Sequence, residues 1–154
     1  MTPKEANLLY LSCYGLAVVL VLFSLWQKNK LDPKKTITRS IFARRLLWMA
    51  LIAMTGEALM VGSYFVFSGA AHFYFFTAVM LVMSVLEYLL MMSSFFQRYG
   101  VYPRGRELAL VILALYVLSD LFMPFGTKYG IAAAGFIGGF ILPDSWDDWK
   151  QSKS

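Results

Sequence analysis

The sequence predicts an all-α protein, namely a polytopic transmembrane helical bundle that forms a single integral membrane domain over residues 1–154. Hydrophobic residues make up 59% of the chain and charged residues only 15%, and the mean hydropathy is +0.61. The charged residues cluster between long apolar runs, whereas in soluble amphipathic helices they alternate with apolar residues. No polar stretch approaches the roughly 50 residues of a small soluble domain, so we expect the function to reside in the membrane or at its surface.

Four apolar runs have about the length that crosses a membrane, which is about 20 residues. The first run lacks the basic start and the small-residue cleavage site of a secretory signal, so it should remain as a membrane anchor. A short turn joins the second and third runs, which must therefore be antiparallel neighbours. The fourth run stops where Pro124 and Gly126 break the helical pattern. We expect spanning helices over residues 8–26, 46–67, 73–96 and 107–123.

A fifth apolar segment covers residues 129–142 and is rich in glycine. Its length suits a thin spanning helix or a re-entrant segment; we favour the first and leave the second open. Small residues at a spacing of four let helix backbones approach closely in membranes. We expect them to pack within the chain, the alternative being a subunit interface. The residues concerned are Gly130, Ala134, Gly135, Gly138 and Gly139.

The basic residues predict the orientation of the chain. They are concentrated in two loops, residues 27–45 and residues 98–106, whereas the turn at residues 68–72 carries none. Loops rich in lysine and arginine stay on the cytoplasmic side. Both basic loops are therefore expected in the cytoplasm and the N-terminus outside, most simply in a plasma (inner) membrane.

The first basic loop carries the signature of a helix start, because Asp32 suits the N-cap and Pro33 the first helical position. Ile37, Ile41 and Phe42 would share one face of such a helix, which predicts an amphipathic helix at the membrane interface. Its basic residues are candidates for docking an anionic lipid or an acidic partner. The simpler interpretation, a topology anchor with non-specific attraction to lipid, is preferred. The candidates are Lys34, Lys35, Arg39, Arg44 and Arg45.

Two glutamates lie inside apolar runs, where an ionised side chain costs at least a few kcal/mol. Antiparallel pairing around the turn places Glu57 opposite Met83, with Glu87 nearer the cytoplasm by about 6 Å along the helix axis. No lysine or arginine lies within either run. Two neighbouring carboxylates in an apolar setting do not both ionise easily, so one should hold a proton unless a cation lies between them. The pair therefore predicts a site for a proton or a cation.

A third candidate acid is Asp120, near the outer end of the fourth run. Each of the three acids also has a structural interpretation. Glu57 and Glu87 can join helices through hydrogen bonds, and Asp120 can be solvated or cap the turn at Pro124. The expected hydrogen-bonding partners of the glutamates are the hydroxyls of Thr55, Ser63, Tyr64, Thr77, Ser84 and Tyr88.

An enzyme is not expected. One cysteine, Cys13, and one histidine, His72, cannot build a histidine-rich metal site or a nucleophile–histidine pair. No glycine-rich loop suited to phosphate is present. We therefore expect neither a cofactor nor a resident metal. The net charge of +5 does not indicate nucleic acid, since the basic residues lie in the loops that set the topology.

Two classes of function stay open. The first is transport, with the intramembrane carboxylates handling a proton or a cation. The second is a non-catalytic accessory or regulatory subunit of a larger membrane complex. The lipid bilayer is the expected partner in either case, and because so few helices enclose little volume, a homo-oligomer or a subunit of a complex is expected as well.

Overall fold

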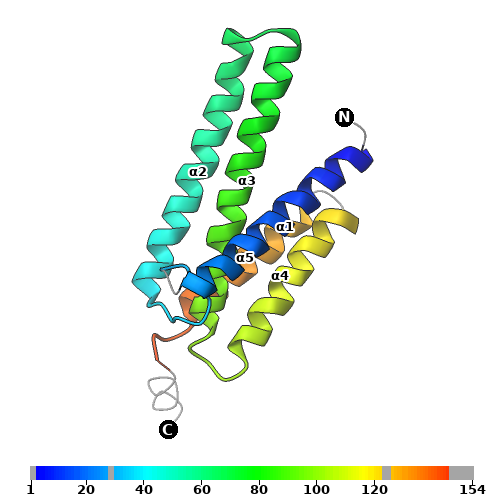
Figure 1. Ribbon diagram of the computed structural model, residues 1–154. Coiled ribbons are helices and arrows are strands. Elements are labelled where there is room, and N and C mark those ends of the chain that lie inside the picture. Colours follow the sequence, from blue (N-terminus) through cyan, green and yellow to red (C-terminus); the bar gives the residue numbers. More distant parts are fainter. Residues whose placement is uncertain (1–2, 28–29, 123–125, 146–154) are drawn as a thin grey trace.

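The computed structural model describes residues 3–27, 30–122 and 126–145, which form five α-helices and no strand (Figure 1). Each predicted apolar run lies within one helix, and no run extends more than one residue beyond the end of its helix. The all-α prediction is confirmed. The helices are α1 (Pro3–Gln27), α2 (Arg39–Val66), α3 (Gly69–Tyr99), α4 (Gly105–Phe122) and α5 (Thr127–Ile141).

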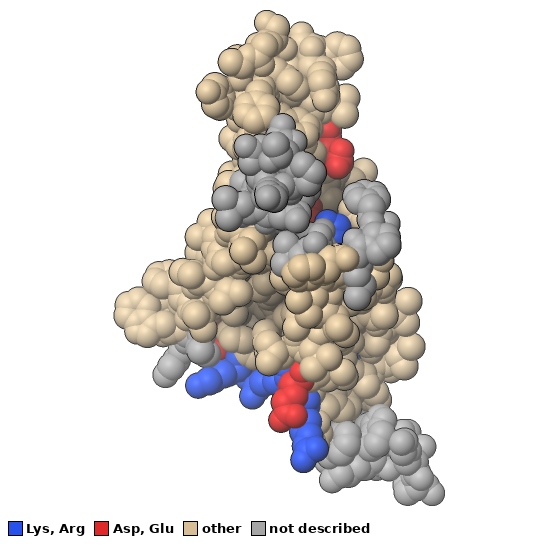
Figure 2. All heavy atoms as spheres, turned by 90° about the vertical axis from the view of Figure 1, so that its right-hand side faces the viewer, with Lys and Arg blue, Asp and Glu red and all other residues tan. Residues whose placement is uncertain are grey.

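Two of the described helices, α2 and α3, are long and apolar enough to cross a membrane, whereas the apolar part of α1, Leu11–Ser24, is shorter. By this measure the predicted bundle of four spanning helices is not confirmed. The outer surface is nevertheless apolar: Phe65 is 87% exposed, Phe122 79% and Trp26 77%. On the face drawn in Figure 2, the charged side chains gather at the lower end, with a smaller group halfway up.

The central element is α3, which packs against each of the other four helices. Helices α2 and α3 form a long hairpin whose upper part projects beyond α1, α4 and α5 (Figure 1). Consecutive helices alternate in direction, so residues 30–39, 98–106 and 142–145 meet at one end of the molecule, called here the basic end. Hydrogen bonds join these segments: the Arg39 backbone N–H donates to Asp144 Oδ1 over 2.6 Å, and Arg106 Nη2 donates to the Lys34 carbonyl over 2.7 Å.

Close packing holds α5 against α2 and α3. A Cβ atom added to Gly135 would lie 2.8 Å from the ring of Phe95, and one added to Gly139 would lie 2.6 Å from the ring of Phe42. No side chain larger than hydrogen fits there without a shift. A Cβ atom on Gly138 would lie 2.5 Å from Tyr99 Oη. By contrast, a Cβ atom on Gly130 would meet nothing within 4 Å, and Ala134 is exposed. Three of the five predicted small residues thus pack within the chain.

The lower end of α5 is fixed by Arg98, whose side chain is completely buried. Its guanidinium donates to the Gly139 carbonyl over 2.7 Å and also to the Leu142 carbonyl, and it pairs with Asp144 over 3.0 Å. The last carbonyls of a helix lack partners within the helix and carry partial negative charge. Arg98 satisfies these groups, and this ties the end of α5 to the end of α3.

The prediction of an amphipathic helix that begins at Asp32–Pro33 is wrong. Residues 31–38 are not helical, and α2 begins at Arg39, so the basic loop is shorter than the predicted 27–45. Asp32 instead closes a turn by accepting the Lys34 backbone N–H over 2.9 Å. The physical reason is that Ile37 and Phe42, which were expected to face lipid, are 8% and 0% exposed. The protein interior takes up Ile37 and Phe42, whereas Ile41, the third residue of the predicted apolar face, is 40% exposed.

Candidate functional site

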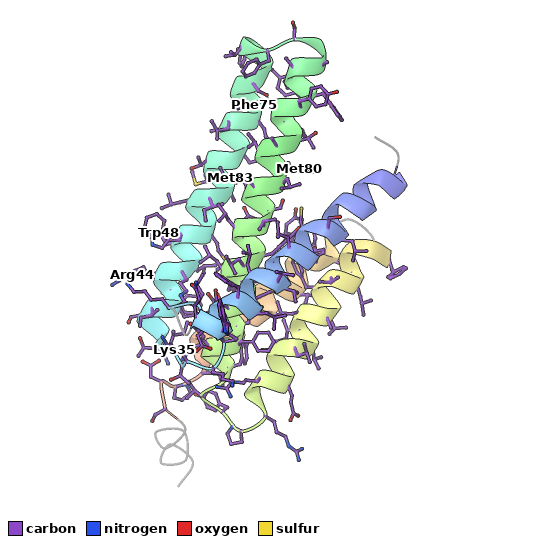
Figure 3. The ribbon with its side chains drawn as sticks, in the orientation of Figure 1. Lys35, Arg44, Trp48, Phe75, Met80 and Met83 are labelled. Carbon is purple, nitrogen blue, oxygen red and sulfur yellow. The ribbon has the colours of Figure 1, made fainter. Side chains whose placement is uncertain are left out.

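The two glutamates of the apolar runs line one cavity of about 320 Å³ between the α2–α3 hairpin and the upper ends of α4 and α5. Met80 and Met83, labelled in Figure 3, lie on the part of α3 that lines this cavity. The cavity is lined by Ala53, Gly56, Glu57 and Met60 of α2, Phe76, Met80, Met83, Ser84, Glu87 and Tyr88 of α3, Tyr116 of α4, and Lys128 and Tyr129 of α5.

The register of the hairpin brings the carboxylates to this cavity. A Cβ atom on Gly56 would lie 3.1 Å from Met83 Cγ, so the backbone beside Glu57 faces Met83 as the antiparallel pairing predicts. Glu87 follows one helical turn after Met83 on the same face of α3. Glu57 is exposed and Glu87 partly buried. Both carboxylates line the same cavity, so they belong to one site.

A lysine that sequence reasoning missed completes the site. Lys128 lies in the first turn of α5 and lines the same cavity. Its depth follows from the shortness of α5. With the lower end of α5 fixed by Arg98, Lys128 lies about 20 Å along the helix from Ile141, and Glu87 lies about 18 Å from Tyr99. The two side chains therefore reach the same level. The sequence offers one signal, a lysine directly after the break at Pro124 and Gly126.

Most of the expected hydroxyl partners are engaged elsewhere. Thr55 Oγ1 donates to the Leu51 carbonyl over 2.7 Å, and Thr77 Oγ1 donates to the Phe73 carbonyl over 2.9 Å, both within their own helices. Ser63 Oγ donates to the Met60 carbonyl over 2.6 Å and lies 3.0 Å from His72 Nδ1. Tyr64 packs on His72 near the tip of the hairpin, with ring centroids 4.3 Å apart. Ser84 and Tyr88 are the members of the predicted set that reach the cavity.

Tyrosine rings form one wall of the site. Tyr88 is buried and stacks on Tyr14 of α1, with ring centroids 4.3 Å apart. Tyr116 of α4 meets both rings edge-on at 6.2 Å. Of these three rings, Tyr88 and Tyr116 line the cavity that also holds the carboxylates.

A second cavity of about 240 Å³ continues from the first toward the basic end, and Glu87 and Tyr88 line both. The walls that it adds are apolar, among them Leu46, Met91 and Phe136. Beyond it the rings of Phe42, Phe95 and Phe136 pack together, with the centroids of Phe95 and Phe136 4.9 Å apart. Phe136 thus joins the wall of the second cavity to this cluster of phenylalanine rings.

The other predicted site residues are placed as follows. The side chain of Asp120 lies outside the described part of the structure. Arg45 donates to the Lys30 carbonyl over 2.9 Å, and Arg39 Nη2 donates to the Leu142 carbonyl over 3.3 Å, so both are used within the chain. Lys34, Lys35 and Arg44 are exposed, and Arg44 points outward from α2 (Figure 3).

The described residues contain no group of three or more His, Cys, Asp or Glu side chains that could hold a metal ion. The carboxylates of Glu57 and Glu87 are the acidic oxygen ligands that the first cavity offers. No family model, no curated protein and no solved structure gave a significant match to this chain.

Proposed function

We propose that this chain is a multi-pass membrane protein with a transport-type function, in which Glu57 and Glu87 bind a proton or a monovalent cation. The observation that carries the proposal is the charge of the cavity. Two carboxyl groups and one amino group line it, so at full ionisation one negative charge is uncompensated. Because an uncompensated charge at membrane depth costs at least a few kcal/mol, the site favours an occupant that brings one positive charge.

The shape of the site supports a cation as well as a proton. A proton needs no room, whereas about 320 Å³ lies within the range of small-molecule sites. The packing of Phe42, Phe95 and Phe136 on the side of the site toward the basic end is compatible with a carrier, which needs a barrier on one side of its binding site at a time.

The proposed topology has α1 to α4 as four spans and α5 as a fifth, thinner one. The alternating directions of the helices and the meeting of residues 30–39, 98–106 and 142–145 at one end support it. With the basic end in the cytoplasm, the N-terminus lies outside and residues 142–145 inside. We place the protein in the plasma (inner) membrane, as a homo-oligomer or a subunit of a complex, with no enzymatic activity.

The proposal is tested by flux across vesicles. The purified chain is reconstituted with a pH-sensitive dye inside, and proton flux is followed under imposed gradients of proton, sodium or potassium ions. We expect flux in the parent, loss of flux in Glu57→Gln and Glu87→Gln, and retention in Glu107→Gln, an exposed acid outside the cavity. Glutamine variants that carry flux like the parent would refute the role of the carboxylates.

The second candidate, an accessory subunit of a larger membrane complex, is favoured by the projecting end of the α2–α3 hairpin. Its apolar side chains are exposed, with Phe65 at 87%, Val66 at 74% and Tyr74 at 70%, and it extends beyond the other helices (Figure 1). An accessory role predicts no flux by the chain alone, unchanged behaviour of both glutamine variants, and loss of a copurifying protein when this tip is made polar.

A further inference from the structure

A separate cavity of about 390 Å³ lies on another side of α3, between α1 and α4. Its walls are apolar side chains from three helices, among them Val18 and Leu22 of α1, Met92 of α3 and Leu110 of α4. Leu22 is 57% exposed and Leu110 59%, so the cavity opens outward. It is a groove that faces the hydrocarbon region in the proposed topology.

Two basic side chains, Lys34 and Arg106, stand at the end of this groove that adjoins the basic end. Both are exposed. Arg106 Nη2 donates to the Lys34 backbone carbonyl over 2.7 Å, which holds the guanidinium beside the loop and leaves the Lys34 ammonium unused by that bond. Within the described ranges the ion pair found is that of Arg98 with Asp144. The two cations at the groove are thus available to an external anion.

We propose that this groove binds one anionic phospholipid of the surrounding bilayer. An acyl chain lies along Val18, Leu22 and Leu110, and the headgroup phosphate meets Lys34 and Arg106. Basic pockets between transmembrane helices at the cytoplasmic side bind anionic headgroups in this way. Two cations match a lipid with a net negative charge, whereas the ammonium group of a zwitterionic lipid is repelled by the second cation. The site is independent of the carboxylate cavity.

The proposal differs from general attraction of lipid to basic residues, because it assigns the effect to two of the cations at this end of the molecule. Arg44 is the matched control. It is exposed and points away from the bundle (Figure 3), and it does not line the groove. Lys34→Gln is the cleanest variant, since the backbone carbonyl of residue 34, not its side chain, accepts the bond from Arg106.

The test measures binding of phosphatidylglycerol and phosphatidylcholine to the delipidated protein in mild detergent, by native mass spectrometry. We expect the parent to prefer phosphatidylglycerol at least tenfold. Lys34→Gln and Arg106→Gln should each weaken phosphatidylglycerol binding about fivefold, Arg106→Lys should retain the preference, and Arg44→Gln should bind like the parent. Leu110→Trp, which fills the groove without removing charge, should weaken both lipids.

The melting temperature of each variant is measured alongside, so that loss of the fold is not read as loss of the site. Equal binding of the two lipids by the parent would overturn the proposal. So would a loss in Arg44→Gln as large as that in Lys34→Gln, which assigns the effect to the general surface charge. Unchanged binding in Leu110→Trp would overturn the placement of the acyl chain.

Discussion

Two glycines of α5 should respond in opposite directions to the same substitution. An alanine in place of glycine within a helix stabilises it by about 0.5–1 kcal/mol, because the unfolded chain loses less conformational freedom. Gly130→Ala should show this gain, since the added Cβ atom meets nothing within 4 Å. Gly62→Ala in α2, where the space is also open, provides a second measurement of the same effect.

Gly139→Ala should lower the free energy of unfolding, because the cost of overpacking exceeds the gain from helix propensity. Its Cβ atom would lie 2.6 Å from Phe42 Cε1, whereas carbon atoms pack at about 3.5–4.0 Å, so the ring must move by about 1 Å. Phe42 is fully buried, and three other rings lie with centroids 5.5, 5.9 and 6.3 Å away. Overpacking a filled interior costs about 1–3 kcal/mol. After the helix gain is subtracted, we expect a net destabilisation of about 1–2 kcal/mol.

The assay is the reversible unfolding of the purified protein in mixed micelles, titrated with sodium dodecyl sulfate and followed by circular dichroism. The quantity compared is the change in the free energy of unfolding of each variant relative to the parent. Stabilisation of Gly139→Ala by the same amount as Gly130→Ala would refute the close contact of α5 with α2.

Three further predictions rest on other parts of the fold. Arg98→Met keeps the approximate volume of the side chain but leaves the Gly139 and Leu142 carbonyls without donors. Each unsatisfied acceptor costs about 1–3 kcal/mol, and removal of the buried charge recovers part of this cost, so the free energy of unfolding should fall by about 2–4 kcal/mol. A change as small as that of Arg44→Met would contradict the role of Arg98 in holding the end of α5. Gly138→Ala brings a Cβ atom to 2.5 Å from Tyr99 Oη. The loss of unfolding free energy in the double variant Gly138→Ala, Tyr99→Phe should therefore be smaller than the sum of the losses in the two single variants. Simple additivity in the same unfolding assay would exclude that contact. Single cysteines are introduced at residues 34, 70 and 104 in a Cys13→Ser background and labelled with a membrane-impermeant reagent. Residues 34 and 104 should react from one side of the membrane and residue 70 from the other, because these positions lie at opposite ends of the α2–α3 hairpin. Labelling of all three from one side would overturn the proposed topology.

The sequence was sufficient to predict the helices and the register of the hairpin, because both follow from local features. Long apolar runs predict the helices, and a short turn fixes which residues of α2 and α3 face each other. Glu57 and Glu87 therefore reach one cavity as predicted, although their role as a cation site stays a prediction. The spacing of Gly135 and Gly139 predicted close packing for the same reason.

Long-range packing decided the features that the sequence could not predict. The depth of Lys128 depends on how the far end of α5 is held, and that depends on Arg98, which by sequence is one more basic residue of a loop. The segment at Asp32–Pro33 carries a valid signal for a helix start, yet its backbone carbonyls bind the side chain of Gln97. The Gln97 side-chain amide donates to the Lys30 carbonyl over 3.1 Å and to the Asp32 carbonyl over 2.5 Å. These tertiary bonds compete successfully with a local helix.

The binding of a proton or a cation by the carboxylates of the cavity is the central claim, and the infrared response of these carboxyl groups tests that claim most directly. The measurement is the infrared difference spectrum of the carboxyl bands, recorded on addition of acid and on addition of a monovalent cation. Glu107→Gln is the control, because its exposed acid lies outside the cavity. The parent and Glu107→Gln should show the same change in the carboxyl bands, and Glu57→Gln and Glu87→Gln should each lose it. An equal change in the parent and in both cavity variants would contradict the account.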